Sequence, residues 1–512
     1  MTTSSKKNFL KFIKYGEIPP AYKEIPYSPP HLVYESLMSP NSFLLESVKG
    51  PENIARYSFI GFDPYLTFKV KDGAVEINTK DKRAVSSANP LARLKSLVDA
   101  YRQTPLESLP PFQGGAVGLL SYDFVRYIEK LPKTTKDDLK IPDVHFLMID
   151  KLIAFDHPAK KAWIVVCPGA RDTELGYGDV DIDPVRKKSQ PELSNGVDWA
   201  EKYDEAEETI KNIRYRIQDT GCRAEEEKNH ASCSAHHASS IRHEMSKEQY
   251  MDIVKRAKEY IAAGDIFQAN ISLRVSADIG DIKTWSLYKI LRSINPSPFA
   301  GYIDFGDYQL VSSSPERLLK VKGGVIETRP IAGTRPRGRD MKEDELMRTE
   351  LLLNEKERAE HIMLIDLERN DIGRVSDYGS VHVDELMITE DYSHVIHIVS
   401  NVKGNLASGK NCFDAIKAAF PGGTITGVPK VRCMEIIDEL EPVSRGPYTG
   451  SFGYIGFSGS MDLNIVIRTF VIKDGFAYVQ AGAGIVADSD PEKEYYESLK
   501  KAEALIRTLE RL

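Results

Sequence analysis

The first part of the chain alternates short apolar runs with turn-forming residues. "SFLLESVKG", "ARYSFIGFDPYLTFKV" and "GGAVGLLSYDFVRYIE" are near-alternating or continuous in their apolar residues and are broken by Gly, Pro and Asp. Such runs predict β-strands. "PLARLKSLVDAYRQ" and "WAEKYDEAEETIKNIRYRIQ" instead repeat their apolar residues with the period of a helix. We therefore expect mostly sheet with covering helices.

A polar segment then interrupts the pattern. "CRAEEEKNHASCSAHHASSIRHEM" (Cys222–Met245) is rich in Ser and Ala and has no period, which predicts a linker or long surface loop. The spacing of the His and Cys residues in this segment fits no structural zinc site, and the segment has no apolar scaffold. A linker is therefore favoured over a metal site. The residues that suggest a metal site as the alternative are His230, Cys233, His236 and His237.

After the linker, strands and helices alternate to the C-terminus. "SKEQYMDIVKRAKEYIAAGD" predicts an amphipathic helix, capped by Ser246 and stopped at Gly264. The expected organisation is a first domain over residues 1–221, a linker over 222–245 and a larger mixed α/β domain over 246–512.

Composition narrows the class of protein. The 512 residues are 41% hydrophobic and 28% charged, as in globular proteins. A net charge of −7 provides no overall attraction to nucleic acid or anionic membranes. No apolar run approaches the roughly 20 residues of a membrane span. The N-terminus lacks a signal-peptide core and the five cysteines are scattered, so we expect a cytoplasmic protein.

Three stretches in the second half concentrate residues suited to chemistry. The first, "NEKERAEHIMLIDLERNDIGRV", predicts a helix in which Glu357 and Glu360 share one face. Such paired carboxylates either hold a hard cation or are simply solvated. The apolar positions expected on its buried face are Ile362, Leu364, Ile365 and Leu367.

The second stretch is "QAGAGIVADSDPEKEYYESLKKAEAL". Gly482 and Gly484 would let backbone N–H groups approach an anion closely. Asp490 is expected to cap a helix that begins at Pro491. Glu494, Glu497 and Lys501 follow on that helix, where the alternative is an ordinary exposed Glu–Lys pair.

The third stretch is "FPGGTITGVPKVRCMEIIDELEP", in which a Gly-rich turn feeds a helix whose N-terminus can receive an anion. Behind it, Arg468 lies in "NIVIRTF", which predicts a strand. A buried arginine needs a partner, and either a ligand carboxylate or Glu435 would serve. Together the three stretches indicate a small dianion with a divalent cation, and no nucleotide-binding fingerprint is present.

These motifs carry a resemblance to a known family. "PIAGTRPRG", "EKERAEHIMLIDLERNDIGRV", "YSHVIHIVSNVKG", "FPGGTITGVPK" and "AGAGIVADSDPEKEY" occur in the family's order, and "SFLLES" and "RYSFIG" match its N-terminal domain. The chain resembles the large synthase subunit of the chorismate-utilising enzymes, the group of anthranilate synthase and aminodeoxychorismate synthase. The resemblance implies an α+β fold, with two mixed β-sheets packed as a sandwich and helices outside.

The resemblance also implies a site. Mg²⁺ would be held by Glu360 and Glu497, His397 would be the acid/base residue, and Thr424 would position the enolpyruvyl arm of chorismate. The residues that would surround the substrate are Gly333, Thr334, Tyr448, Arg468, Gly482, Ala483, Gly484 and Lys501. A metal ion polarises a ring substituent, and a histidine can move a proton near neutral pH.

Two positions bear on which member of the family this is. Gln268 stands where the resemblance places a lysine in water-using members, and glutamine cannot deprotonate water, so ammonia is expected as the nucleophile. Ammonia implies a separate glutamine amidotransferase, because "VVCPGA" around Cys167 lacks that enzyme's Gly-x-Cys-x-Gly motif. Ala332 stands where aminodeoxychorismate synthases typically carry a lysine.

Alanine at this position leaves ring carbon C2 open to ammonia, which favours anthranilate as the product. "QANISLR", "SSSPERLL" and "YTGSFGYIGF" look more like the aminodeoxychorismate branch, which is the alternative. A non-catalytic regulatory subunit is a third interpretation, and the intact Glu360, Glu497, Arg468 and His397 argue against it.

A second ligand site is implied in the N-terminal half. Glu46, Ser47 and the segment Pro298, Phe299 and Ala300 match the tryptophan feedback site of anthranilate synthases. Phe299 and Ala300 replace the usual Tyr-Met pair. Because the methionine would pack against the indole ring, we expect tryptophan feedback to be weak.

Overall fold

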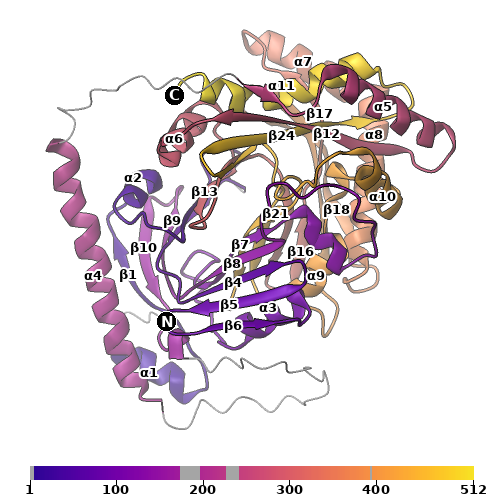
Figure 1. Ribbon diagram of the computed structural model, residues 1–512. Helices are drawn as coiled ribbons and strands as arrows, with labels where there is room; N and C mark the ends of the chain where they lie inside the picture. Colours follow the sequence, from indigo (N-terminus) through magenta and orange to yellow (C-terminus); the bar gives the residue numbers. More distant parts are fainter. Residues whose placement is uncertain (1–4, 53, 173–196, 227–240, 393–394) are drawn as a thin grey trace.

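The computed structural model describes residues 5–52, 54–172, 197–226, 241–392 and 395–512. It contains two large β-sheets, with helices on the outside (Figure 1). The possible metal ligands of the linker, His230, Cys233, His236 and His237, lie outside the described residues. No helix in the described ranges is long and apolar enough to cross a membrane.

The first sheet has twelve strands. Their order is β1 (Ala21–Ile25), β10 (Lys161–Val166), β9 (Lys151–Asp156), β3 (Tyr57–Gly61), β2 (Ser42–Glu46), β13 (Phe299–Asp304), β14 (Gln309–Ser314), β23 (Thr469–Lys473), β24 (Phe476–Ile485), β12 (Gln268–Asp278) and β11 (Arg242–His243), with β20 (Gly427–Val428) beside β12.

The second sheet also has twelve strands. Their order is β17 (Ile331–Pro336), β19 (Val395–Asn405), β16 (Val325–Thr328), β15 (Arg317–Lys322), β22 (Met461–Asn464), β21 (Ser451–Gly456), β7 (Gly115–Leu120), β8 (Val144–Ile149), β4 (Leu66–Lys71), β5 (Ala74–Thr79) and β6 (Arg83–Ser86), with β18 (His382–Asp391) beside β19.

The two-sheet fold is confirmed, and all the pairings that join these strands are antiparallel, as for β4 with β5 and β13 with β14. Some pairs are hairpins, as for β4 with β5, whereas others join strands far apart in the sequence, as for β2 with β13. The sheets are therefore antiparallel rather than mixed.

Both sheets combine strands from the two sides of the expected domain boundary. In the first sheet β2 pairs with β13, and in the second β7 pairs with β21. The domain boundaries at residues 221 and 246 stay a prediction. The segments before and after these boundaries each contribute strands to both sheets. The expected linker starts too early, because α4 (Trp199–Glu226) continues through residues 222–226. Ala, Arg and Glu in this stretch are strong helix formers.

Three apolar layers hold the sheets. One lies between them and contains Phe43 and Phe59 of the first sheet with Val117 and Phe452 of the second. A second lies outside the first sheet, under α5 (Lys247–Ala262), α6 (Thr284–Ile294) and α11 (Pro491–Leu509). The third lies outside the second sheet, under α3 (Pro90–Asp99), α8 (Glu355–Gly373) and α9 (Cys412–Ala419).

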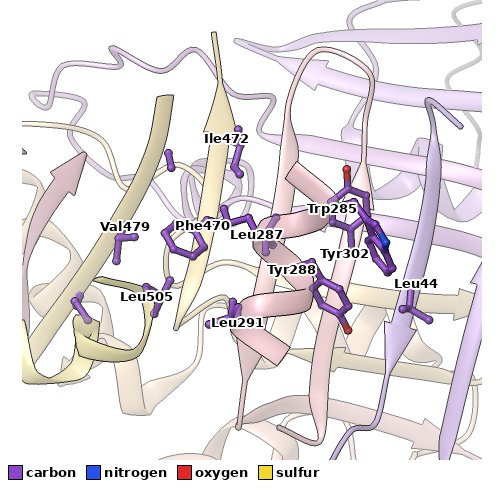
Figure 2. Close-up of a cluster of buried hydrophobic side chains, with 14 of the residues drawn as sticks. Leu44, Trp285, Leu287, Tyr288, Leu291, Tyr302, Phe470, Ile472, Val479 and Leu505 are labelled. Carbon is purple, nitrogen blue, oxygen red and sulfur yellow. The ribbon is translucent and has the colours of Figure 1, made fainter. Parts of the chain in front are cut away.

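Figure 2 shows part of the layer over the first sheet. Leu287 of α6 lies beside Phe470 of β23, and Trp285 lies beside Tyr302 of β13. The rings of Trp285 and Tyr302 meet edge to face at 5.3 Å. This contact joins α6 to the strand that also carries Phe299 and Ala300.

The predicted caps are confirmed for two helices. Ser246 and Gln249 form a capping box at the start of α5, and Gly264 follows its end with φ of +82°. Asp490 accepts backbone N–H bonds at the start of α11. These caps satisfy amide groups that have no partner within the helix.

The buried face of α8 differs from the prediction at one position. Leu364 and Ile365 are buried with His361 and Glu368, whereas Ile362 is 49% exposed. Residues 361, 364, 365 and 368 share a face at helical spacing, and position 362 points away from it. Of the polar residues on this face, Glu368 lies near Glu316, which belongs to the site described next.

Candidate active site

The candidate site lies where β17 and β19 of the second sheet approach β12 and β24 of the first, with α8 and α11 beside them. Side-chain contacts bring the predicted residues together in small groups. Thr334 contacts His397, Gln268 contacts Glu360, and Lys501 contacts Glu497.

A bulge in β17 places Thr334. Ala332 lies opposite Ile398 and Thr334 lies opposite His397, so Gly333 is an extra residue in the strand. Its φ of +67° is a left-handed conformation that favours glycine. The bulge lets Thr334 Oγ1 approach His397 Nδ1 to 2.9 Å. Ala332 is buried next to it.

His397 is oriented as a base. Its Nδ1 lies 3.3 Å from the Gly333 carbonyl oxygen, which can only accept a hydrogen bond, so we place the ring proton on Nδ1. Nε2 is buried and has no hydrogen-bond partner among the described residues. Burial, with the charge of Arg468 second, lowers the pKa of His397 to about 3. The ring is therefore neutral and Nε2 carries no proton, although the lowered pKa also makes this atom a weaker proton acceptor than a free imidazole.

Arg468 does not lie in a strand, contrary to the prediction. It lies in the link between β22 and β23, with φ of +50°, and that conformation ends the extended backbone. Burial lowers the pKa of its guanidinium. Glu435 is not its partner, because Glu435 accepts from Arg432 at 2.8 Å. In the described part of the chain no hydrogen bond or ion pair engages the Arg468 guanidinium, so the ligand-carboxylate alternative stays open.

Thr424 contacts Glu316, a residue that the sequence analysis does not assign to the site. Its Oγ1 donates to Glu316 Oε1 at 2.8 Å, and Glu316 is almost fully buried. Burial raises the pKa of Glu316 to about 7, and the nearby charges of Glu368 and Arg468 respectively raise and lower it. The signal in the sequence is the acidic residue of "SSSPERLL", which stands among apolar and small residues.

Gln268 has a fixed side-chain amide. Its Nε2 donates to Glu360 Oε1 at 2.9 Å. Its Oε1 is buried and accepts no hydrogen bond within the described residues. The amide lies over Gly484, where a Cβ atom would be 2.4 Å from Nε2. Only glycine fits there, and the orientation leaves Oε1 available to an N–H donor.

Carboxylates from two helices gather around Lys501. Its Nζ lies 2.9 Å from Glu497 Oε1 and 3.1 Å from the Gly482 carbonyl oxygen. Burial raises the pKa of Glu360 and of Glu494, and neighbouring carboxylates add to both shifts. A divalent cation would relieve this repulsion, and carboxylate oxygens are suitable ligands for Mg²⁺. The described residues contain no group of three or more His, Cys, Asp or Glu side chains placed to hold a metal ion.

The remaining substrate-binding candidates differ in orientation. Tyr448 is buried, with the Arg445 guanidinium 5.5 Å from its ring centre. Ala483 packs its side chain into the helix-covered core, so only its backbone can face a substrate. At Gly482 a Cβ atom would come within 2.4 Å of the Ile271 carbonyl oxygen, which explains the glycine there.

The predicted effector residues all line one cavity. Glu46, Ser47, Pro298, Phe299 and Ala300 border a space of about 510 Å³ between the two sheets. Its aromatic walls include Tyr57, Phe59, Phe452 and Tyr454.

Glu46 is already engaged in this cavity. Arg292 donates to both of its carboxylate oxygens, at 2.8 and 2.9 Å, and Tyr288 donates at 2.7 Å. Although burial opposes the shift, contacts with His31 and Arg292 lower the pKa of Glu46 to about 2.

Comparison with known proteins agrees with this geometry. The family model described as chorismate binding enzyme matches residues 40–507. The chain belongs to this family. The match covers most of both sheets and every residue of the candidate site.

Relatives that carry two different names are similarly close to this chain. Aminodeoxychorismate synthase component 1 of Bacillus subtilis (strain 168) is 42% identical over 495 residues, which are 96% of this chain and 97% of the relative. Anthranilate synthase component 1 of Acetivibrio thermocellus is 43% identical over 471 residues, 91% of this chain and 90% of the relative.

A solved structure supports the fold. The crystal structure of anthranilate synthase component I from Streptococcus pneumoniae TIGR4 aligns with a TM-score of 0.71 and 34% identity. The alignment covers 88% of this chain and 92% of that one. Overall identity therefore does not separate the two types.

Proposed function

We propose that this chorismate-binding enzyme aminates chorismate with ammonia and forms anthranilate and pyruvate. The observation that carries the amination is the side chain of Gln268, whose Nε2 donates to Glu360 while Oε1 accepts no hydrogen bond from the residues that the structure describes. An acceptor oxygen can hold ammonia by an N–H bond, but an amide cannot remove a proton from water.

Proton transfer is assigned to two buried groups. Ammonia adds at C2 as the C4 hydroxyl leaves, and Glu316, whose pKa is about 7, donates the proton that converts this hydroxyl to water. The added nitrogen then gives up one proton, which restores the Glu316 carboxyl. His397 Nε2 then removes the proton from C2 as the C3–O bond breaks and the ring becomes aromatic; this proton ends on the methylene carbon of the departing enolpyruvate, which becomes pyruvate. Arg468 would bind a substrate carboxylate through its guanidinium.

The residues that would hold Mg²⁺ are Glu360 and Glu497, because carboxylate oxygens are the ligands this ion prefers. When bound there, it would neutralise a carboxylate of the substrate and polarise it. Lys501, which now contacts Glu497, would move to make room or would help to hold the same substrate group.

The product assignment rests on Ala332. Its methyl group cannot attack the ring, so C2 remains open to ammonia. We further propose that a separate glutamine amidotransferase supplies ammonia to this chain. A second candidate is amination at C4 to aminodeoxychorismate, which the closeness of the Bacillus subtilis relative favours.

The first experiment incubates the purified chain with chorismate, Mg²⁺ and ammonium at pH about 8.5, where amines start to lose their proton, and separates the products by chromatography. Anthranilate with pyruvate supports the proposal. Aminodeoxychorismate, converted to 4-aminobenzoate only when a lyase is added, would favour the second candidate.

A substitution on α8 tests whether the chain is catalytic or only a binding subunit. Glu360→Gln should abolish Mg²⁺-dependent turnover, because it removes a negative charge from the proposed metal site. Asp366→Asn is the matched control, since Asp366 lies on the exposed side of the same helix, where it pairs with Arg369 at 2.9 Å. Equal loss in both variants, or in neither, would contradict the metal assignment.

A further inference from the structure

Glu368 is a buried carboxyl group that the proposed reaction does not use. It lies on α8 and is 3% exposed. The backbone N–H of Gly423, the first residue of the short helical turn Gly423–Ile425, donates to its Oε1 at 3.4 Å. The next residue of the turn, Thr424, donates to Glu316 Oε1 at 2.8 Å. Two successive residues of one turn therefore contact the two carboxyl groups, which brings Glu368 close to the proposed proton donor.

The strands on the other side of Glu368 show the same proximity. Thr328, at the end of β16, has its Oγ1 3.1 Å from Glu368 Oε2 and 2.9 Å from the Leu318 carbonyl oxygen. Leu318 is two residues beyond Glu316, and two residue steps of extended backbone cover about 7 Å. Contacts through the turn and contacts through β15 thus both place the two carboxyl groups near one another.

The contacts of Thr328 indicate the protonation state of Glu368. A threonine hydroxyl carries one proton, and the Leu318 carbonyl oxygen can only accept a hydrogen bond. With that proton directed to Leu318, the contact with Glu368 Oε2 is a hydrogen bond only when the carboxyl group supplies a proton of its own. Glu368 Oε1 meanwhile accepts from Gly423. One oxygen that donates and one that accepts are the pattern of a neutral carboxylic acid.

The positive charges nearest to Glu368 are engaged elsewhere. Asp371 lies one turn further along α8, is 1% exposed and forms an ion pair with Lys430. Arg374 lies 3.9 Å from the other oxygen of Asp371. Among the described residues no lysine or arginine forms an ion pair with Glu368. A negative charge on Glu368 would therefore be buried beside a second carboxylate, without a counter-ion of its own.

The same conditions apply to Glu316. Burial raises the pKa of Glu316 and of Glu368 to about 7. A charge on Glu368 raises the pKa of Glu316 further, and the charge of Arg468 lowers it. Two carboxylates in one buried space repel each other, so the second proton is lost with more difficulty than the first.

We propose that Glu368 is a positioning residue for proton donation by Glu316, because the two carboxyl groups act as one pair that keeps at least one proton. The pair rests on the proposed function, in which Glu316 protonates the leaving hydroxyl. A charge on Glu368 keeps Glu316 protonated before the reaction, whereas a neutral Glu368 lets Glu316 carry the charge after it has donated. No proton passes through Glu368, so the balance of the reaction is unchanged.

Neutral replacements of Glu368 in the full chain test the pair. Glu368→Gln can keep both hydrogen bonds, and Glu368→Met keeps only a similar volume. Glu355→Gln is the matched control, since Glu355 is exposed at the start of the same helix. The kcat of each variant is measured at saturating chorismate, ammonium and Mg²⁺ and is divided by the wild-type kcat at the same pH, so that the titration of ammonium cancels. Melting temperatures verify folding.

In both Glu368 variants this ratio should fall about tenfold between pH about 6 and pH about 8.5, because Glu316 loses its proton about one pH unit earlier without the neighbouring charge. The ratio of the control should stay at one. A ratio that does not change with pH in the folded Glu368 variants would overturn the pair, whether the ratio is near one or uniformly reduced. A purely structural role acts equally at every pH.

Urea unfolding tests the same pair without substrate. At pH about 8.5, Glu316→Gln and Glu368→Gln should each raise the urea midpoint, and the double variant should gain less than the sum, because either change alone removes the repulsion between the carboxylates. Gains that simply add would overturn the pair. A wild-type chain that does not convert chorismate with ammonium would instead refute the proposed function, and the unfolding comparison would still decide whether the pair exists.

Discussion

At the scale of single residues, the pair of Thr334 and His397 is the most specific contact of the site. Thr334→Val should lower kcat about tenfold at unchanged KM for chorismate, because one hydrogen bond that orients the imidazole is lost at similar side-chain volume. Thr334→Ser keeps the hydroxyl and should retain most of the activity. Steady-state kinetics of both variants test this, and equal rates would show that the hydroxyl does not orient His397.

Glu316 gives a prediction about stability and pH. Its folded pKa of about 7 is raised from the usual 4.5, so the folded chain holds this proton more tightly than the unfolded chain. The resulting stability is fully present below pH 4.5 and is lost as pH rises through 7. At pH about 8, Glu316→Gln should be more stable than wild type by up to about 3 kcal/mol. The gain should come with a loss of turnover if Glu316 donates a proton.

Urea unfolding at acidic and alkaline pH measures this difference. The advantage of Glu316→Gln should disappear at low pH, where the wild-type carboxyl is also neutral. Glu510→Gln, at the exposed C-terminal end of α11, is the control and should match wild type at both pH values. A variant that is less stable than wild type at alkaline pH would contradict the assignment of a buried, protonated carboxyl.

At the scale of elements, the bulge in β17 determines what the strand presents to the site. A Cβ atom at Gly333 would lie 2.9 Å from Glu357 Oε2, and its φ is left-handed. Gly333→Ala should therefore destabilise the chain by about 1–2 kcal/mol and also lower kcat, because Thr334 loses its position opposite His397. Gly323→Ala controls for backbone strain alone, since Gly323 has φ of +58° and open space around it.

Thermal melts and kcat values separate the two effects. Gly323→Ala should lose stability but keep its activity, whereas Gly333→Ala should lose both. If both variants keep wild-type kcat, the bulge does not position the site.

The same scale shows what the sequence could predict. Helices α5 and α11 were predictable because Ser246 and Asp490 act on neighbouring residues. The prediction of a strand at Arg468 was wrong, because an apolar run does not reveal a single residue with a left-handed backbone conformation. Glu316 was missed because its partner Thr424 is 108 residues away. The motifs identified most of the site, but the contacts that define its chemistry depend on the pairing of distant strands.

At the scale of the whole molecule, the two large sheets connect the cavity lined by the predicted effector residues to the candidate active site. Arg317 lines the cavity and pairs with Asp462 at 2.8 Å. The preceding residue, Glu316, contacts Thr424 in the site. A ligand in the cavity is therefore separated from the proposed proton donor by one residue of backbone. Occupancy of the cavity and turnover can be coupled through this segment.

Tryptophan inhibition tests that connection. Wild type should be inhibited only weakly, because Ala300 offers little surface to an indole ring in the cavity. Ala300→Met should strengthen inhibition about tenfold or more, since burying a methionine side chain contributes about 1.5–3 kcal/mol. Ala74→Met adds the same side chain at an exposed strand end and is the control.

The measurement is the tryptophan concentration that halves the rate of each variant. Inhibition of wild type at about 1 μM, which corresponds to a binding free energy of about −8 kcal/mol, would show that the aromatic walls and Phe299 suffice without a methionine. Stronger inhibition in Ala300→Met alone would place the effector beside β13. It would also show that a residue outside the candidate site controls turnover through the shared sheets.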